Sequence, residues 1–174
     1  MLFAHDTEVA LVSAAALVNA DLPDIDAVDE FFAAYDWAGT WSRTKTELKA
    51  VQELRPRLRE LWDADEDRIV EIVNSLLLEY RALPQLVKHD HWPYHLHAVP
   101  SDSPLSARMA VEAAMAFVDV VRSGEVSRLR ICELGDCGNV LVDLSKNRSK
   151  RFCDTGCGNR AAVSAYRARK AARK

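Results

Sequence analysis

The sequence predicts a mainly α-helical protein with a small β-hairpin region, in which a helical N-terminal domain is followed by a small cysteine-containing module. Two observations predict this architecture. Apolar residues recur at helical spacing in several segments of the first 125 residues, which is typical of helices that bury one face. All four cysteines lie between residues 132 and 157. A chain of 174 residues with 49% hydrophobic content is large enough for one core and one small module.

Four helices are expected before Pro84. They are predicted at 6–20, 27–35, 44–61 and from the acidic run at 63–67 to just before the proline. Asp6 or Thr7 is expected to cap the first helix. Pro56 lies inside the apolar stripe of the third helix, where it should kink the helix or mark a boundary.

A histidine-rich segment follows these helices. The residues from 92 onward alternate as in a β-strand, and 86–89 could form the hairpin partner. A ligand pocket that involves His95 or His97 is one hypothesis for this segment. In an extended strand four histidines would share one face and could bind a second metal ion or an acidic ligand: His89, His91, His95 and His97. Alternatively, the histidines face solvent and three intervening side chains are buried: Trp92, Tyr94 and Leu96.

The segment 105–121 is predicted to form a long apolar helix that lies mostly in the core. Its face rich in Ala and Met could pack against a second copy, giving a homodimer. Short strands are expected at 127–131 and 140–142, and residues 151–152 should start a strand that returns beside the latter. A terminal helix should begin near Gly158 and pack back on the hairpin through Val163 and Tyr166. Because the connection is short, we expect the module to dock on the helical body.

The cysteines form the pattern C-x4-C, fifteen residues, C-x3-C, which is typical of a chain that wraps one tetrahedral zinc ion. Two disulfides or buried free thiols are the alternatives, but the close pairs are short for disulfide loops. Two knuckles around a hairpin, followed by a helix, indicate a treble-clef-like or ribbon-like zinc module. The predicted ligands are Cys132, Cys137, Cys153 and Cys157.

We expect this zinc ion to be structural and the protein not to be an enzyme. Four thiolates close the coordination sphere and leave no open position for water. The sequence also contains no Ser/His/Asp signature, phosphate-binding glycine loop or metalloprotease helix.

Charge is divided unequally along the chain. Residues 1–125 contain 11 Lys and Arg and 22 Asp and Glu, a net charge of −11, whereas residues 126–174 contain 12 and 4, a net charge of +8. An acidic body with a basic, zinc-binding tail is typical of a nucleic-acid-binding protein with a separate regulatory domain. A merely solvated tail is the alternative. Four basic residues could instead keep the thiolates ionised: Arg148, Lys150, Arg151 and Arg160.

The run DLSKNRSKRFC at 143–153, followed by CGNR at 157–160, resembles the bacterial CGNR zinc-finger family, whose members are described as stress-induced transcriptional regulators. In that family a helical domain called ABATE precedes a finger to which DNA binding is attributed. The resemblance is strong over roughly the last 45 residues. It implies an ABATE-like regulatory domain at 1–125 and a finger with a basic helix at 126–174. Phe152 departs from the tryptophan found in many relatives.

These observations lead to the hypothesis of a transcriptional regulator that binds double-stranded DNA, with an N-terminal domain that senses a small molecule or a partner. The hairpin would hold phosphates through Arg148, Lys150 and Arg151. The terminal helix would enter the major groove with Asn159, Arg160, Arg167 and Lys170. Asn147 and Asn159 could instead be local turn and cap residues. The alternative function is a zinc-stabilised adaptor that binds protein or RNA without sequence-specific DNA binding.

The N-terminal segment predicts a helix and not a targeting signal. It has no basic leading region, and its apolar run is broken by charges and too short to span a bilayer. We therefore expect a cytoplasmic protein with no membrane partner. A reducing cytosol also favours zinc thiolates over disulfides.

Overall fold

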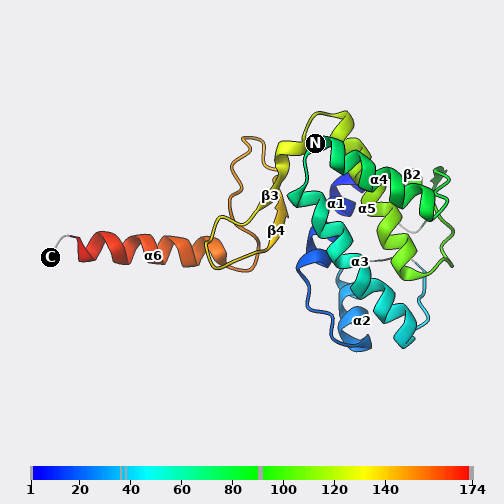
Figure 1. Ribbon diagram of the computed structural model, residues 1–174, viewed down its shortest axis with the longest axis horizontal. Coiled ribbons are helices and arrows are strands. Elements are labelled where there is room, and N and C mark those ends of the chain that lie inside the picture. The colour runs from blue at the N-terminus through cyan, green and yellow to red at the C-terminus, as the bar shows by residue number, and fades with distance from the viewer. Residues whose placement is uncertain (1, 36, 38, 90–91, 173–174) are drawn as a thin grey trace.

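The computed structural model describes residues 2–35, 37, 39–89 and 92–172, and it confirms the predicted mainly α-helical class with small hairpins (Figure 1). The helices are α1 (His5–Asn19), α2 (Ile25–Ala34), α3 (Lys45–Asp63), α4 (Glu66–Glu79), α5 (Leu105–Arg122) and α6 (Cys157–Ala171), with a 3-10 turn at Val126–Arg128. The strands are β1 (Gln85–Val87), β2 (His95–His97), β3 (Leu129–Ile131) and β4 (Val140–Val142), paired antiparallel as β1–β2 and β3–β4.

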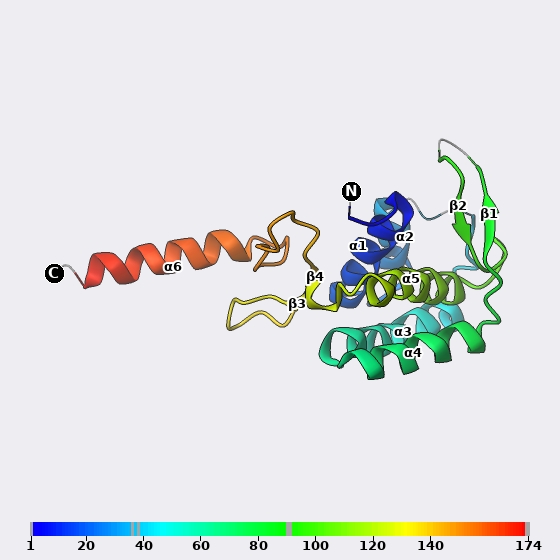
Figure 2. The ribbon, with the colours of Figure 1, turned by 90° about the horizontal axis from the view of Figure 1, so that it is seen from above.

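Helix α5 lies at the centre of the helical body and packs against α1, α3 and α4 (Figure 2). Its alanines are largely buried, and such small side chains let neighbouring helices approach closely. Phe117 of α5 is fully buried and meets Trp62 of α3 edge to face, with ring centroids 5.1 Å apart. The long apolar helix predicted at 105–121 is therefore confirmed as the core element.

Three helices start with a side-chain cap, whereas α1, α5 and α6 start without one. Asp24, Thr44 and Asp65 cap α2, α3 and α4 by accepting a hydrogen bond from the backbone amide three residues later. The prediction that Asp6 or Thr7 caps α1 is wrong, because the helix begins one residue after Ala4 without a side-chain cap. The Thr7 hydroxyl is 2.6 Å from Asp119 Oδ2, so it joins α1 to α5 instead.

Pro56 does not end α3, so a boundary at this position is excluded. Proline removes one backbone hydrogen bond and costs about 3 kcal/mol inside a helix. Here it occupies an exposed position between the buried residues Leu54 and Leu58. Burying each leucine contributes about 2 kcal/mol, so the apolar stripe outweighs the proline.

Glu47 is a buried carboxylate that joins the starts of α3 and α5. It accepts hydrogen bonds from the Ser42 backbone amide at 2.7 Å and from the Leu105 amide at 2.5 Å. Burial disfavours its ionisation, but the hydrogen bonds from Ser42 and Leu105, with the nearby Arg108 cation, hold its pKa below the usual value.

The β1–β2 hairpin confirms the predicted strand pairing and distinguishes between the two predicted arrangements of its faces. Leu86 pairs with Leu96, and Val87 pairs with His95. The alternative in which Tyr94 and Leu96 are buried and the histidines face solvent is wrong. Tyr94 and Leu96 are 72% and 43% exposed, whereas His95 is 9% exposed. The reason is that the histidine face turns toward a cavity bordered by α1 and α5. His91 lies outside the described residues.

Strand β4 pairs with β3 and not with residues 151–152, which form no strand, so the predicted return strand is wrong. Val140 and Val142 belong to the main core, whereas Leu141 packs among the cysteines. Because both faces of β4 are buried, the strand is held between the helical body and the cysteine cluster.

Side chains from the helical body bind the backbone of this small module. The Trp62 indole nitrogen is 2.9 Å from the Leu141 carbonyl, and Arg59 donates to the Gly138 carbonyl. The module therefore docks on the body, as the short connection predicted.

Helix α6 extends away from the rest of the molecule in both views (Figure 1, Figure 2). Val163 and Tyr166 are 48% and 59% exposed, so the prediction that they pack back on the hairpin is wrong. Cys157 is the buried residue of α6, and the helix is held at its first turn. Among the residues that the structure describes, no helix is both long and apolar enough to cross a membrane.

Candidate metal centre and basic helix

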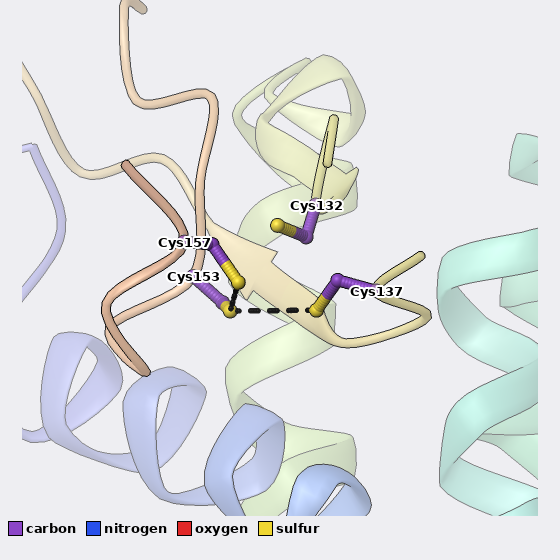
Figure 3. A group of neighbouring side chains, drawn as sticks. All are labelled: Cys132, Cys137, Cys153 and Cys157. Atoms are coloured by element: carbon purple, nitrogen blue, oxygen red, sulfur yellow. Dashed lines mark hydrogen bonds between the residues drawn. The ribbon is translucent and has the colours of Figure 1, made fainter. Parts of the chain in front are cut away.

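The four cysteine sulfurs converge on one point (Figure 3). Cys153 Sγ is 3.7 Å from Cys137 Sγ and 3.5 Å from Cys157 Sγ, and all four sulfurs lie within 4.8 Å of one another. A tetrahedral zinc site with Zn–S bonds of about 2.3 Å has sulfurs about 3.8 Å apart. Disulfide sulfurs are only about 2.05 Å apart. The spacing and the soft thiolate donors therefore fit a zinc ion.

Two turns bring the cysteines together. Strand β3 ends just before Cys132, whose amide donates to the Asn139 carbonyl at 2.8 Å, and the Cys137 amide donates to the Leu134 carbonyl at 2.8 Å. In the second turn Gly156 has a φ of +82°, a conformation that L side chains rarely adopt. This turn places Cys157 as the first residue of α6, where the helix dipole favours a thiolate.

The surroundings of the sulfurs favour ionisation unequally. Burial disfavours the Cys153 thiolate, but hydrogen bonds from the Thr155 side chain and backbone lower its pKa to about 6. The backbone amide of Asn139 favours the Cys137 thiolate, but desolvation and the other three thiols raise the pKa of Cys137 to about 12. A divalent cation offsets this crowding, because it binds the deprotonated form of each sulfur.

Asp143 organises the loop between the cysteine pairs, a role that the sequence did not indicate. Its side chain is 1% exposed. It accepts hydrogen bonds from the Ser145 amide at 3.0 Å and the Lys150 amide at 2.9 Å. Burial opposes ionisation, but the hydrogen bonds from Ser145 and Lys150 and the Arg130 cation hold the pKa of Asp143 below its usual value.

The basic residues proposed to hold phosphates are paired with acids of the same region. Arg148 lies 3.0 Å from Glu125, and Lys150 lies 2.9 Å from Asp154. Arg151 Nε lies 2.6 Å from Glu133.

Arg160 of α6 pairs with Asp136, and its Nη1 is 4.0 Å from Cys157 Sγ. Four basic residues were considered as partners of the thiolates, and within the described part of the chain the contact with a sulfur comes from Arg160.

The remaining candidates for base contacts lie on the exposed surface of α6. Asn159, Arg167 and Lys170 are exposed, as is Arg160. Arg160 and Arg167 are seven residues apart and so lie on the same face of the helix. No acidic residue follows Asp154 in the sequence, so α6 carries only positive side-chain charge.

The histidine segment contributes to a second site in the helical body. His95 and His97 line a cavity of about 200 Å³, together with His89, Asp6 and Glu112. A cavity is therefore present at His95 and His97, where the sequence suggested a ligand pocket. Ligand binding in this cavity stays a prediction.

Comparison with known families gives two matches. A model described as "CGNR zinc finger" matches residues 128–170, and the ABATE model, described as "Putative stress-induced transcription regulator", matches residues 9–124. A search of curated proteins found no match. The matches confirm the resemblance inferred from the motif. The chain therefore belongs to the ABATE family of proposed stress-induced transcription regulators, and it carries a CGNR zinc finger after its helical domain.

Proposed function

We propose that the protein is a transcription regulator that binds double-stranded DNA through its zinc module, while its N-terminal domain responds to a ligand or partner. The observation that carries this proposal is α6, an exposed helix without acidic residues whose first residue belongs to the cysteine cluster. A structural zinc ion would hold the root of this helix and present the rest of it to a partner.

The dimensions and side chains of α6 suit the major groove of DNA. A helix of 15 residues is about 22 Å long, and the groove admits one α-helix. Arginine forms paired hydrogen bonds with guanine, and asparagine does so with adenine. Arg160 and Arg167 would face the bases, with Asn159 and Lys170 on the adjoining face.

Phosphate contacts would come from the basic side chains around the cysteine loop. Arg148, Lys150 and Arg151 are at present paired with acids at or near the protein surface. Exposed ion pairs such as Arg151 with Glu133 contribute about 0–1 kcal/mol each, so exchanging a carboxylate for a phosphate costs little there. The net charge of −11 on residues 1–125 would keep the body away from DNA and so orient the module.

The zinc ion in this proposal has a structural role. Four cysteine sulfurs fill a tetrahedral shell, which leaves no position for a water nucleophile, so we do not assign an enzymatic activity to this site. The cavity in the helical body is the place proposed for a regulatory ligand.

A second candidate function is a zinc-stabilised adaptor for protein or RNA. The exposure of Val163 and Tyr166 on α6 favours it, because apolar side chains on a projecting helix can enter a groove of a partner protein. An RNA partner would use the same basic surface.

Binding of the zinc-loaded full-length protein to a pool of random duplex DNA, measured over a salt series, tests these alternatives. The regulator requires binding that weakens steeply with salt and is lost after chelation, and repeated selection should enrich one sequence. An RNA pool measured in parallel identifies the adaptor that binds RNA. Absence of duplex binding at low salt, with zinc content verified, would contradict the DNA-binding proposal.

A further inference from the structure

Three histidine rings of the helical domain point their Nε2 atoms at one another. His89 Nε2 is 2.9 Å from His97 Nε2 and 3.1 Å from His95 Nε2, and the last two nitrogens are 3.0 Å apart. His95 and His97 come from β2, whereas His89 follows β1 across the hairpin. The three nitrogens therefore form a nearly equilateral triangle beside the cavity described above.

The outer nitrogens of two rings indicate which tautomer is present. His95 Nδ1 lies 2.8 Å from the Pro93 carbonyl oxygen, which can only accept, so Nδ1 carries a hydrogen and, in the neutral imidazole, Nε2 carries the lone pair. His97 Nδ1 lies 3.5 Å from a carboxylate oxygen of Glu112, which favours the same tautomer. Two lone pairs consequently meet across 3.0 Å, which is repulsive unless a cation lies between the rings.

We propose that His89, His95 and His97 form a second metal site, which binds a divalent first-row transition ion such as Zn²⁺. Neutral imidazoles suit this class of ion. A shared proton could join two of the three nitrogens, whereas a metal ion engages all three. The proposal goes beyond DNA binding and does not depend on it.

The triangle has the right size for three metal–nitrogen bonds. With bonds of about 2.05 Å, an ion would lie roughly 1.1 Å above the plane of the nitrogens, and the angles between bonds would be about 95°. Three ligands on one side leave the opposite side of the ion open. Water or a small anion could take that position from the cavity, which the cysteine site does not allow.

The groups around the histidines also favour a cation. His95 is 9% exposed, so the site is partly shielded from water. The Pro93 carbonyl and the Glu112 carboxylate would hold two of the rings in their ligating orientation, as is usual for histidines bound to metals. The carboxylates of Asp6 and Asp119 also line the cavity, and with Glu112 they outnumber its one cationic lining residue among those that the structure describes, Arg122.

Metal content of the full-length protein tests the site directly. After incubation with excess Zn²⁺ and desalting, we expect two zinc ions per chain in the wild type and one in His95→Ala or His97→Ala. His5→Ala is the matched control, because His5 is outside the triangle, and it should keep both ions. A wild type that retains only one ion, with the same content in all variants, would show that the histidines share a proton only.

Cobalt substitution on the wild type answers the same question without relying on the folding of a histidine variant. We expect two saturating equivalents, one with thiolate charge-transfer bands and one with only the weaker visible bands of a nitrogen and oxygen site. Cys153→Ser should remove the first set of bands and keep the second. Saturation at one equivalent, with thiolate bands alone, would overturn the proposal.

Discussion

Asn19, the last residue of α1, forms two hydrogen bonds with the backbone of Val140 in β4. Its amide nitrogen donates to the Val140 carbonyl at 2.8 Å, and its amide oxygen accepts from the Val140 amide at 2.8 Å. Strand β4 has β3 on one side only, so Asn19 takes the place of a neighbouring strand on the other side. The pair therefore fixes the zinc module on the helical body.

Asn19→Ala should lower the free energy of unfolding by about 2–3 kcal/mol, because two backbone groups of a buried residue lose their partners. Chemical denaturation of the zinc-loaded protein measures this loss. Asn74→Ala, at an exposed position of α4, is the control and should change stability by less than about 0.5 kcal/mol. Equal stability of the two variants would mean that the pair does not contribute to docking.

Cys153→Ser should release the zinc ion and unfold α6 while the helical body keeps its core. An isolated helix of about 15 residues is marginal in water, and α6 is held only at its first turn. Metal analysis and limited proteolysis of the basic tail measure the two effects. If the tail is equally protected in the metal-free wild type and in the variant, the zinc ion does not hold α6 folded and its structural role is wrong.

Reversing two charges on α6, with Arg160→Glu and Arg167→Glu, should weaken duplex DNA binding by at least roughly tenfold, because each base or phosphate contact is worth about 1–3 kcal/mol. The salt dependence of binding should also become shallower. Lys45→Glu with Lys49→Glu makes the same change of charge on exposed positions of α3 and is the control.

Zinc content must stay unchanged in both double variants, since Arg160 lies near Cys157. Unaltered DNA affinity in the α6 variant would show that DNA binds to another part of the chain.

Glu47→Gln should destabilise the helical body by about 1.5–3 kcal/mol at neutral pH, as expected for hydrogen bonds to a charged group. The pKa of Glu47 is lowered in the folded state, so its contribution is present above the unfolded pKa and is lost as the pH falls through the folded value. The difference between wild type and variant should therefore shrink in acid. Zinc release affects both proteins alike and does not alter this comparison.

Denaturation at several pH values measures this trend. Glu53→Gln, on an exposed part of α3, should behave as the wild type throughout. A wild-type advantage that is independent of pH would show that the charge of Glu47 is not responsible.

The sequence predicted those features that depend on local pattern. Apolar periodicity located the helices, and cysteine spacing located the convergent sulfurs. Strand partners were harder to predict, because a three-residue strand such as β4 can pair with any short extended neighbour. The sequence did not predict that α6 projects from the molecule, because Val163 and Tyr166 are residue types that usually pack in a core. In the structure both side chains are exposed.

The local sequence pattern also could not predict which face of the histidine hairpin turns toward the helical body. A strand with alternating side chains can turn either face inward, and the choice depends on what the rest of the fold offers. Here α1 and α5 border a cavity that contains carboxylates, so the histidines face the cavity and Tyr94 is exposed.

Helix α1 contacts both the histidine hairpin and strand β4 of the zinc module. Near its start, Asp6 accepts a hydrogen bond from the Leu96 amide of the histidine hairpin, and at its end Asn19 holds β4. The helix thus acts as a strut about 22 Å long between the histidine triangle and the cysteine cluster. If binding of an ion at one of these sites changes the affinity of the other site, the second ion must change the affinity of the first by the same factor, because linkage between two binding sites is reciprocal.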